Sequence, residues 1–469
     1  MIKQILRFTA FILLAWFVLA TGSCKKKDTV DTSPSVFLKF STDTVLFDTV
    51  FTTIGSVTQR LMVYNTNAQK VMISSIRMGS SGSSNFRINV DGISTTSATD
   101  VEIPANDSIY IFVRVTVDPT NQNNPMVIAD SLLFTTNGNL QKVKLIAWGW
   151  DAHFYKNKKI EGSVTFDSLK PHVVFGYLRV DTAANLTIQA GSKIYFHKDA
   201  YLAASYQSTL KVEGTLDHPV RFQGDRLDPF YRDLPGQWDG IYLEKGSVAN
   251  EIKYAVIKNG STGIQIDSAS SSAVPMLELD NTIIQNVTGP GIYAYASSIK
   301  SINCVVGNCG SSAIALEFGG SYEFDQLTIG NYWTSSVRQD SSLYITNYYF
   351  DDIGTKRTNP LTKASFGNII LYGNLDSELG FDVEPSVTFN FMFDHCLLRT
   401  KHSVSDPAHF NACLVNQDPD FINPAYYDYR IDSISPVRKK GIQISGAEFD
   451  IKGVFRGSLP DLGAYQYVK

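Results

Sequence analysis

The sequence has 469 residues, of which 43% are hydrophobic, 12% aromatic and only 18% charged, and it contains 33 glycines. This length exceeds the usual size of a single hydrophobic core, so we expect at least two domains. The composition argues against a disordered or coiled-coil protein and is typical of a folded, β-rich, exported protein. The formal net charge of −4 argues against nucleic acid as a partner.

The N-terminus has the pattern of an export signal. Lys3 and Arg7 precede an apolar run at residues 8–20, which is too short to span a bilayer. The following Thr21-Gly22-Ser23-Cys24 resembles a bacterial lipobox, although a typical lipobox has Leu where Thr21 stands. The resemblance implies a signal peptide at 1–23, lipid attachment at Cys24 and a tether at 24–35, which places the mature chain on the cell envelope, at the outer membrane. The alternative is ordinary secretion with an incidental Cys24.

The mature chain is more acidic than the precursor. Removal of Lys3 and Arg7 lowers the Lys and Arg count from 41 to 39 against 45 Asp and Glu, so the net charge changes from −4 to −6. Cys304, Cys309, Cys396 and Cys413 are too few and too scattered for a disulfide framework, and the sequence has no metal-type CxxC pair. We interpret Cys304 and Cys396 as small buried core residues, because no base is identifiable beside either. No resident metal or cofactor is expected.

Residues 36–150 are predicted to form a β-sandwich, because short alternating runs such as 60–64, 109–113 and 143–147 are separated by turn residues. The segment resembles the hydin-type immunoglobulin-like domain. The motifs that carry this resemblance are Gly55-Ser56, Asn65, Phe86 with Ile88, Pro104 to Ser108, and Asp118-Pro119 before Leu132-Leu133-Phe134. They position strands and offer neither a nucleophile nor a metal cage, so we interpret this domain as a spacer.

The C-terminal two-thirds contains internal repeats. Residues 254–259, 281–286, 303–308 and 326–331 superimpose without gaps, and their terminal asparagines recur after 27, 22 and 23 positions. Such a period is typical of one coil of a β-solenoid, whose coils bury their apolar sides only against each other. Asn259, Asn286, Asn308 and Asn331 are expected to stack in a hydrogen-bonded ladder. Alternation within the repeats predicts the inward positions Ala255, Thr282, Cys304 and Leu327, together with Ile257, Ile284, Val306 and Ile329.

The repeats and their flanks resemble pectate-lyase-like right-handed β-helix proteins. The upstream rungs that carry the resemblance are 178–180, 186–188, 191–196, 210–216, 219–222 and 236–241, and the downstream ones are 368–371 and 395–398. Residues 450–456 and 460–465 resemble the closing segment of exported β-helix proteins. We therefore expect an all-β chain in which residues 151–469 form a right-handed parallel β-helix of about ten coils. This scaffold carries lyases, glycosidases, adhesins and spacers, so it does not set the activity.

A charged loop is the strongest candidate ligand surface in the sequence. Pectate-type lyases gather acidic residues around Ca²⁺ beside an Arg or Lys that takes a proton, and only this interpretation would require Ca²⁺. The alternative is a solvated loop whose carboxylates pair with its own arginines, because the order of residues matches no lyase motif. The candidate residues are Asp225, Arg226, Asp228, Tyr231, Arg232, Trp238 and Asp239.

Other patterns in the β-helix are weaker. Asp351-Asp352 lacks the Gly-His-Gly and Arg-Ile-Lys motifs of polygalacturonase-type glycosidases and is more typical of a turn. Asp394, His395, Arg399 and His402 also cluster, but His395 falls where a rung begins and Cys396 lies on an inner column beside it, so packing explains these two. A further set of aromatic residues lies near rung edges, where the rings could stack on sugars or cover the core. These residues are Tyr293, Tyr295, Tyr332, Trp333, Tyr348 and Tyr349.

These patterns favour a binding or adhesion module for a glycan or another surface partner, without catalysis. The alternative is a glycan-cleaving enzyme, for which Asp225, Asp228 and Asp239 would have to converge with Arg226 or Arg232 on one outer groove. A third hypothesis is a purely structural element, which predicts neither a groove nor an exposed aromatic row.

Overall fold

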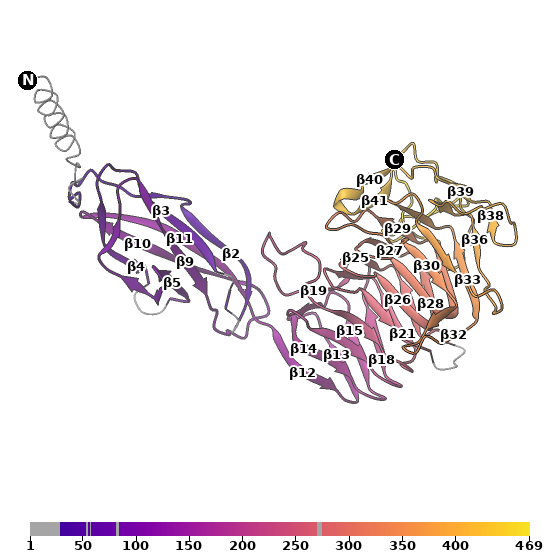
Figure 1. Cartoon of the computed structure of the whole chain (residues 1–469). Helices are drawn as coiled ribbons and strands as arrows, with labels where there is room; N and C mark the ends of the chain where they lie inside the picture. The colour runs from indigo at the N-terminus through magenta and orange to yellow at the C-terminus, as the bar shows by residue number, and fades with distance from the viewer. Residues whose placement is uncertain (1–28, 53–54, 57, 81–83, 270–273) are drawn as a thin grey trace, which may run out of the picture. The chain divides into compact units, whose positions relative to one another are not determined.

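The structure is a computed structural model that describes residues 29–52, 55–56, 58–80, 84–269 and 274–469. The chain divides into two compact units, one made of residues up to 120 with 125–150 and the other of 121–124 with 151–469. The predicted signal peptide and Cys24 lie outside the described residues. Strands dominate the described part, whose single helix is the 3-10 turn η1, Pro424–Tyr426 (Figure 1). Nothing in that part is a helix long and apolar enough to cross a membrane.

The first unit is a β-sandwich, as predicted. Its two sheets have the strand orders β1-β3-β9-β5-β6 and β2-β11-β10-β4-β7, with β8 added on β4. Inward side chains of both sheets, such as Leu61, Phe86 and Leu132, form one core. The strands are β1 Lys39–Phe40, β2 Thr44–Phe51, β3 Gln59–Asn65, β4 Val71–Met78, β5 Phe86–Val90, β6 Ile93–Thr95, β7 Ser97–Ala98, β8 Val101–Ile103, β9 Asp107–Val115, β10 Met126–Thr136 and β11 Asn139–Trp150.

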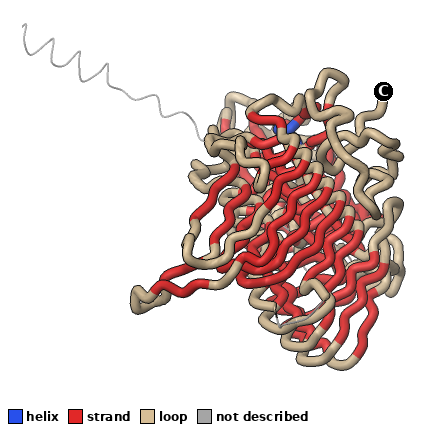
Figure 2. The backbone as a smooth tube through the Cα atoms, turned by 90° about the vertical axis from the view of Figure 1, so that its right-hand side faces the viewer, coloured by secondary structure: helices blue, strands red, loops and turns tan. Residues whose placement is uncertain are grey.

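The second unit is a parallel β-helix, which confirms the predicted fold. Its strands pair with the equivalent strands one coil away, so the coils stack as three parallel sheets around a common core (Figure 2). Long strands bend from one sheet into the next and contribute to both.

The first sheet contains the ends of β12 His153–Ile160 and β14 His172–Val180 and the starts of β26 Ile292–Ile302 and β28 Ile314–Asp325. It also contains β17 Tyr201–Ala204, β20 Gly240–Leu243, β23 Ile264–Ile266, β30 Leu343–Thr346 and β35 Leu379–Asp382. The second contains β13 Ser163–Phe166, β15 Asn185–Gln189, β18 Thr209–Glu213, β21 Asn250–Lys253, β24 Leu277–Asp280, the ends of β26 Ile292–Ile302 and β28 Ile314–Asp325, β33 Leu361–Gly367, β36 Met392–Asp394 and β38 Phe410–Asn411. The third contains the starts of β12 His153–Ile160 and β14 His172–Val180, and β16 Lys193–Phe196, β19 Val220–Gly224, β22 Ala255–Lys258, β25 Ile283–Val287, β27 Val305–Cys309, β29 Thr328–Asn331, β34 Ile370–Gly373, β37 Leu397–Leu398 and β39 Leu414–Val415.

Single residues in the left-handed conformation turn the chain from the second sheet into the third. They have φ between 45° and 54°, a region that non-glycine residues seldom adopt and that asparagine tolerates best. This turn recurs on successive coils and so keeps the coils in register. Its residues are Tyr254, Asn281, Asn303, Gln326, Asn368, His395 and Ala412.

The core of the β-helix consists of ladders of like side chains. The eight inward positions predicted from the repeats are all buried. Phe324, Phe366, Phe393 and Phe410 occupy equivalent positions on neighbouring coils, and their rings stack in sequence with interplanar angles of 5° to 8°. Parallel stacking of this kind fills the core without voids, because each ring meets the same shape above and below.

Three of the four predicted ladder asparagines form the ladder. Asn286 donates to Asn259 Oδ1 at 2.8 Å, and Asn308 donates to Asn286 Oδ1 at 2.9 Å, so these buried amides satisfy each other. Asn331 is equally buried but does not continue the ladder. Its Oδ1 accepts from the Cys309 backbone N–H and its Nδ2 donates to the Ser311 carbonyl. Thus Asn331 binds the backbone of the preceding turn instead of the amide of Asn308.

The closing segment at the C-terminus covers the outside of the third sheet over its later coils, at β27, β29 and β34. It carries β40 Phe421–Asn423 and β41 Asp428–Ile431. Tyr429 packs so closely on Gly307 and Gly330 that a Cβ at either glycine would lie within 2.7 Å of its ring or hydroxyl. Arg456 is buried and donates to Asn303 Oδ1 and to two backbone carbonyls of the segment, and burial lowers the pKa of Arg456 to about 10. The segment thereby shields that sheet from solvent.

A buried ion pair fixes the loop between β29 and β30. The Arg338 guanidinium binds both carboxylate oxygens of Glu378, at 2.7 and 2.8 Å, and the two side chains are 1% and 0% exposed. Ser342 Oγ and the Leu375 backbone N–H also donate to the Glu378 carboxylate. We call this pair the clamp. No sequence pattern predicted it, because its members lie 40 residues apart.

Replacing Glu378 by Gln should lower the free energy of unfolding of the β-helix by about 3–5 kcal/mol, because Arg338 would keep its charge in the core without a counterion. Urea denaturation at pH 7 measures this. Asp376→Asn is the matched control, since Asp376 pairs with Lys401 on the surface and should matter little. Equal stability of the Glu378→Gln variant and the unmodified chain would contradict the assignment.

Candidate functional site

Most charged residues of the candidate loop at 225–239 are paired with oppositely charged or histidine side chains. Asp225 is mostly buried and bonds His197 Nδ1 at 2.8 Å, and burial raises the pKa of Asp225. Arg226 lies 3.5 Å from Asp228 and its guanidinium covers the ring of Tyr231. The Arg226–Asp228 pair matches the alternative of a loop whose carboxylates pair with its own arginines, whereas Asp225 is bound by His197 from outside the loop.

The remaining residues of the loop differ in their surroundings. Arg232 pairs with Asp233, which also binds Lys258 at 3.0 Å. Burial, followed by the charge of Asp199, raises the pKa of Asp239. Trp238 is only 1% exposed, because its ring stacks on Phe196 at 4.2 Å in the core. Trp238 is therefore a core residue, contrary to its assignment to the ligand surface.

The weaker sequence candidates have structural roles. Asp351 accepts from the Thr355 N–H and binds Arg357, as expected of a turn residue. His395 bonds its neighbour Asp394 and occupies the left-handed turn before β37. Cys304 and Cys396 are buried, and burial raises the pKa of Cys304 to about 12. Neither thiol therefore has the character of a nucleophile.

A row of tyrosines runs along the outside of the first sheet. Tyr242, Gln265, Tyr293, Ala315, Tyr344 and Gly380 occupy one outward position on successive coils. Tyrosine thus alternates with a smaller residue, and successive tyrosines are separated by two strand spacings, or about 10 Å. We call this surface the tyrosine face. Only Tyr293 of its three tyrosines was among the aromatic residues selected from the sequence.

The small residues leave a groove between the rings. The groove over Ala315 and Gly380 has a volume of about 550 Å³ and is bounded by Tyr293 and Tyr344. Phe381, Glu317 and Asp340 complete its sides together with serine residues. An aromatic, partly polar groove of this size is the usual form of a site for a small molecule or a sugar.

Further aromatic side chains lie beside the row and at the first coils. Tyr295 stacks on Phe318 at 5.1 Å, and the half-exposed Tyr349 meets both rings edge-on. Tyr349 belongs to the hairpin of β31 Tyr348–Phe350 and β32 Lys356–Thr358. At the first coils, a second hollow of about 440 Å³ is lined by Tyr177, Tyr201 and the Arg179–Glu244 ion pair.

Two of the six aromatic residues selected from the sequence lie elsewhere. Trp333 is buried and donates from Nε1 to Ser336 Oγ, and Tyr332 packs beneath the closing segment. The other four, Tyr293, Tyr295, Tyr348 and Tyr349, are at least partly exposed. The sequence therefore identified aromatic residues of the face but could not separate them from core aromatics.

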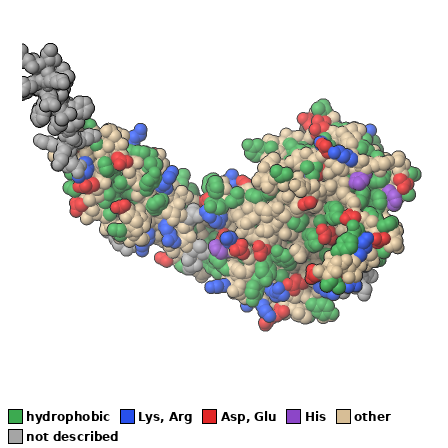
Figure 3. All heavy atoms as spheres, in the orientation of Figure 1, with side chains coloured by type: hydrophobic (Ala, Val, Ile, Leu, Met, Phe, Trp, Pro, Cys, Tyr) green, Lys and Arg blue, Asp and Glu red, His purple; other side chains and the backbone are tan. Residues whose placement is uncertain are grey.

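Charge gives little indication of a different site. On the face of the β-helix drawn in Figure 3, basic and acidic side chains are interspersed rather than gathered in one patch. Within the described residues, no group of three or more His, Cys, Asp or Glu side chains is arranged to hold a metal ion.

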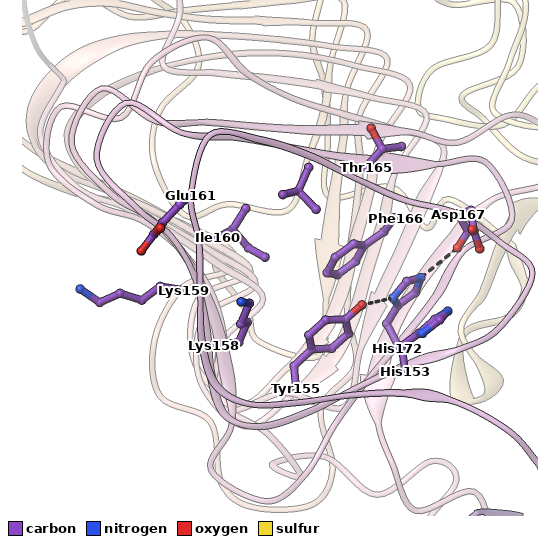
Figure 4. A pocket seen from close by; sticks show the side chains of 11 residues that line it. His153, Tyr155, Lys158, Lys159, Ile160, Glu161, Thr165, Phe166, Asp167 and His172 are labelled. Carbon is purple, nitrogen blue, oxygen red and sulfur yellow. Dashed lines mark hydrogen bonds between the residues drawn. The ribbon is translucent and has the colours of Figure 1, made fainter. Parts of the chain in front are cut away.

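A third hollow lies at the first coil, where the core of the β-helix begins (Figure 4). The buried His172 ring stacks on Phe166 at 4.2 Å, its Nδ1 accepts from the Tyr155 hydroxyl, and its Nε2–H donates to the Asp167 carbonyl. A neutral imidazole satisfies both bonds in this arrangement, and burial lowers the pKa of His172 to about 4. Tyr155, Phe166 and His172 thus cap the end of the core with stacked rings whose polar atoms are hydrogen-bonded. This packing role explains the cluster without a ligand.

Comparison with protein families agrees with the fold. The family described as "Right handed beta helix region" matches residues 239–375, which include the tyrosine face from Tyr242 to Tyr344. The search of curated proteins finds no match. The second unit is thus a right-handed parallel β-helix.

Similarity to solved structures is distant. The catalytic unit of a GH87 α-1,3-glucanase from Streptomyces thermodiastaticus strain HF3-3 is 11% identical with a TM-score of 0.33, over 76% of this chain and 75% of that one. A family 123 glycoside hydrolase from Clostridium perfringens is 9% identical with a TM-score of 0.18, over 24% of this chain. A protein of unknown function from Porphyromonas gingivalis W83 is 12% identical with a TM-score of 0.18, over 27% of this chain. The match spans 26% of the Clostridium chain and 60% of the Porphyromonas chain.

Acidification should destabilise the β-helix through His172. Because the pKa of His172 is about 4 in the folded chain and 6.5 when unfolded, the unfolded state binds more protons between these values. The free energy of unfolding should therefore fall by about 3 kcal/mol from this group as the pH drops from about 6.5 to about 4. Urea denaturation across this range measures the loss.

The double variant Tyr155→Phe with His172→Phe removes the hydroxyl and the imidazole that bond each other. Its free energy of unfolding should no longer fall by the contribution of His172 as the pH drops. His153→Gln, which changes the exposed neighbouring imidazole, should keep it. An unchanged pH profile in the double variant would contradict the role assigned to His172.

Proposed function

We propose that the chain is an exported, lipid-anchored protein of the cell envelope whose β-helix binds a glycan along the tyrosine face. The observation that carries the proposal is the alternation of tyrosine with small residues on successive coils, which creates a groove between Tyr293 and Tyr344. A sugar ring presents C–H groups on its face and hydroxyl groups at its edge. Aromatic rings can contact the C–H groups, and carboxylates and serines can bind the hydroxyl groups.

Spacing along the face also suits a chain of sugars. Tyr242, Tyr293 and Tyr344 are held at equivalent positions by backbone pairing, so their separation of about 10 Å is set by the sheet. This is about the length of a disaccharide, so alternate sugars of an extended chain could meet successive rings. Because the strands are rigid, little conformational entropy would be lost on binding.

The N-terminal part of the proposal rests on sequence. Cys24 would carry the lipid at the outer membrane, residues 25–35 would serve as a tether, and the sandwich would be an immunoglobulin-like spacer that presents the β-helix to its partner. The Asp and Glu excess of the chain fits a partner other than nucleic acid.

A glycan-cleaving enzyme is the second candidate, because the carboxylates of Glu317 and Asp340 line the same groove. Glycosidases use two carboxyl groups as acid and base or nucleophile, so the assay must follow cleavage as well as retention. New reducing ends that disappear in Glu317→Gln would identify a glycosidase. Unsaturated products that disappear in Asp225→Ala would instead identify a lyase.

Glycan binding should depend on the rings of the face. We expect Tyr344→Ala and Tyr242→Ala each to weaken retention of the bound glycan at least tenfold, because each removes a central aromatic contact. The measurement is affinity electrophoresis of the full mature chain in gels with neutral, amine-bearing and acidic polysaccharides. Tyr426→Ala is the matched control, since Tyr426 is 80% exposed on the closing segment. Retention by no polysaccharide, or unchanged retention in both variants, would make the proposal wrong.

Lipid attachment should require the Cys24 thiol, since the thioether to diacylglycerol forms on that sulfur. Expression of the full precursor in a Gram-negative host with radiolabelled palmitate should give a labelled, membrane-bound chain. Cys24→Ser should be unlabelled, whereas Cys413→Ser should be labelled normally. An unlabelled wild-type chain in the soluble fraction would indicate ordinary secretion.

A further inference from the structure

The groove between Tyr293 and Tyr344 is acidic as well as aromatic. Its described lining includes the carboxylates of Glu317 and Asp340 and the hydroxyl groups of serines, but no Lys, Arg or His. A third carboxylate, Asp382, lies beside Tyr344. Burial, followed by the charges of Asp382 and Glu317, raises the pKa of Tyr344 to about 12. A ligand that enters the groove therefore meets negative charge.

Glu317 is oriented by the row itself. The Tyr293 hydroxyl donates to Glu317 Oε2 at 2.8 Å, and burial together with this bond raises the pKa of Tyr293. Glu317 Oε1 receives no hydrogen bond from the residues that the structure describes, so it can accept one from a ligand. One oxygen thus holds the carboxylate in place while the other faces the groove.

Asp340 is placed by the clamp. Arg338, while bound to Glu378, also donates to the Asp340 carbonyl at 2.7 Å. The next residue, Ser341, donates from Oγ to the Ser377 carbonyl, and Glu378 leads directly into β35, whose Gly380 forms the floor of the groove. The backbone of the exposed Asp340 is therefore held by a buried ion pair, which preorganises this side of the groove.

Cations around this part of the face are already engaged, with Arg338 bound to Glu378 in the clamp. Lys356 binds Glu384 at 2.8 Å and lies over the ring of Tyr348. At the far end of the face, Arg179 binds Glu244 through both of its terminal nitrogens. The carboxylates of Glu317 and Asp340 form no ion pair with a described residue, so their charge is not cancelled locally.

We infer that this groove accepts sugars without acidic groups, either neutral or amine-bearing, and rejects uronic acids. The inference rests on the proposed glycan binding and specifies its ligand class. A neutral sugar would donate its hydroxyl protons to Glu317 and Asp340, and a protonated amine would add a charge-assisted hydrogen bond. A uronate would bring a like charge into a groove that has no cation to pair with it, and such a mismatch is a strong basis for specificity.

The test measures retention of the full mature chain on three soluble polysaccharides: hydroxyethyl cellulose as the neutral one, chitosan as the amine-bearing one and polygalacturonate as the acidic one. We expect retention on polygalacturonate to be at least tenfold weaker than on the better of the other two. Chitosan retention should weaken with added NaCl, because salt screens its attraction to the carboxylates. Tighter or equal retention on polygalacturonate would overturn the inference while leaving glycan binding intact. Retention on none of the three would count against both.

Charge-removing variants locate the effect. Glu317→Gln combined with Asp340→Asn keeps the shape of both side chains, and the amide oxygen introduced by Glu317→Gln could still accept from the Tyr293 hydroxyl. The double variant should improve retention on polygalacturonate relative to the neutral polymer at least tenfold. Glu278→Gln, which removes a carboxylate from the outer side of the second sheet, should not. The same ratio in the double variant and the unmodified chain, with circular dichroism showing both folded, would also overturn the inference.

Discussion

The arrangement of the β-helix depends on one backbone constraint, the left-handed residue between the second and third sheets. Because it turns the chain within a single residue, neighbouring coils cannot slip relative to each other without breaking a row of positive φ angles. Asparagine fills three of these positions, at 281, 303 and 368, where its side chain tolerates the conformation. The same register that stacks Phe366 on Phe324 inside the core also aligns Tyr293 with Tyr344 outside. Core packing and the candidate site are two results of one alignment.

The clamp connects stability to the site in a second way. A buried ion pair gains little over apolar packing, because removing both charges from water costs several kcal/mol per ion. Its value here is positional, since Arg338 holds the loop backbone at Asp340 while Glu378 holds the loop to β35. An apolar pair could fill the same volume but could not bind these backbone groups. The backbone that carries Asp340 at the groove is therefore held by two buried charges.

The sequence predicted features that repeat and missed features that depend on register. Repeats ending in Asn259, Asn286 and Asn308 were sufficient for the solenoid, its inward positions and most of the ladder. The row of Tyr242, Tyr293 and Tyr344 was missed because its members lie on coils of different length. The shared Gly-Ile-Tyr at 240–242 and 291–293 was the signal that could have found it. The many charged residues at 225–239 led to the prediction of that loop as the ligand surface instead. Local pairing had already neutralised much of that loop, as at Arg226 and Asp228.

The outer surfaces of the three sheets differ in a way that singles out the first. The third sheet is covered where Tyr429 and Arg456 of the closing segment pack against it. The second carries opposite charges on adjacent coils, such as Lys363 with Glu323, which satisfy each other and leave a solvated surface. On the outer surface of the first sheet, tyrosine rings and carboxylates stand beside small residues. These small residues are too short to fill the groove between the rings. A solenoid must expose some outer face to water. This face exposes aromatic rings that could contact the C–H groups of a sugar, and carboxylates that could accept hydrogen bonds from its hydroxyl groups.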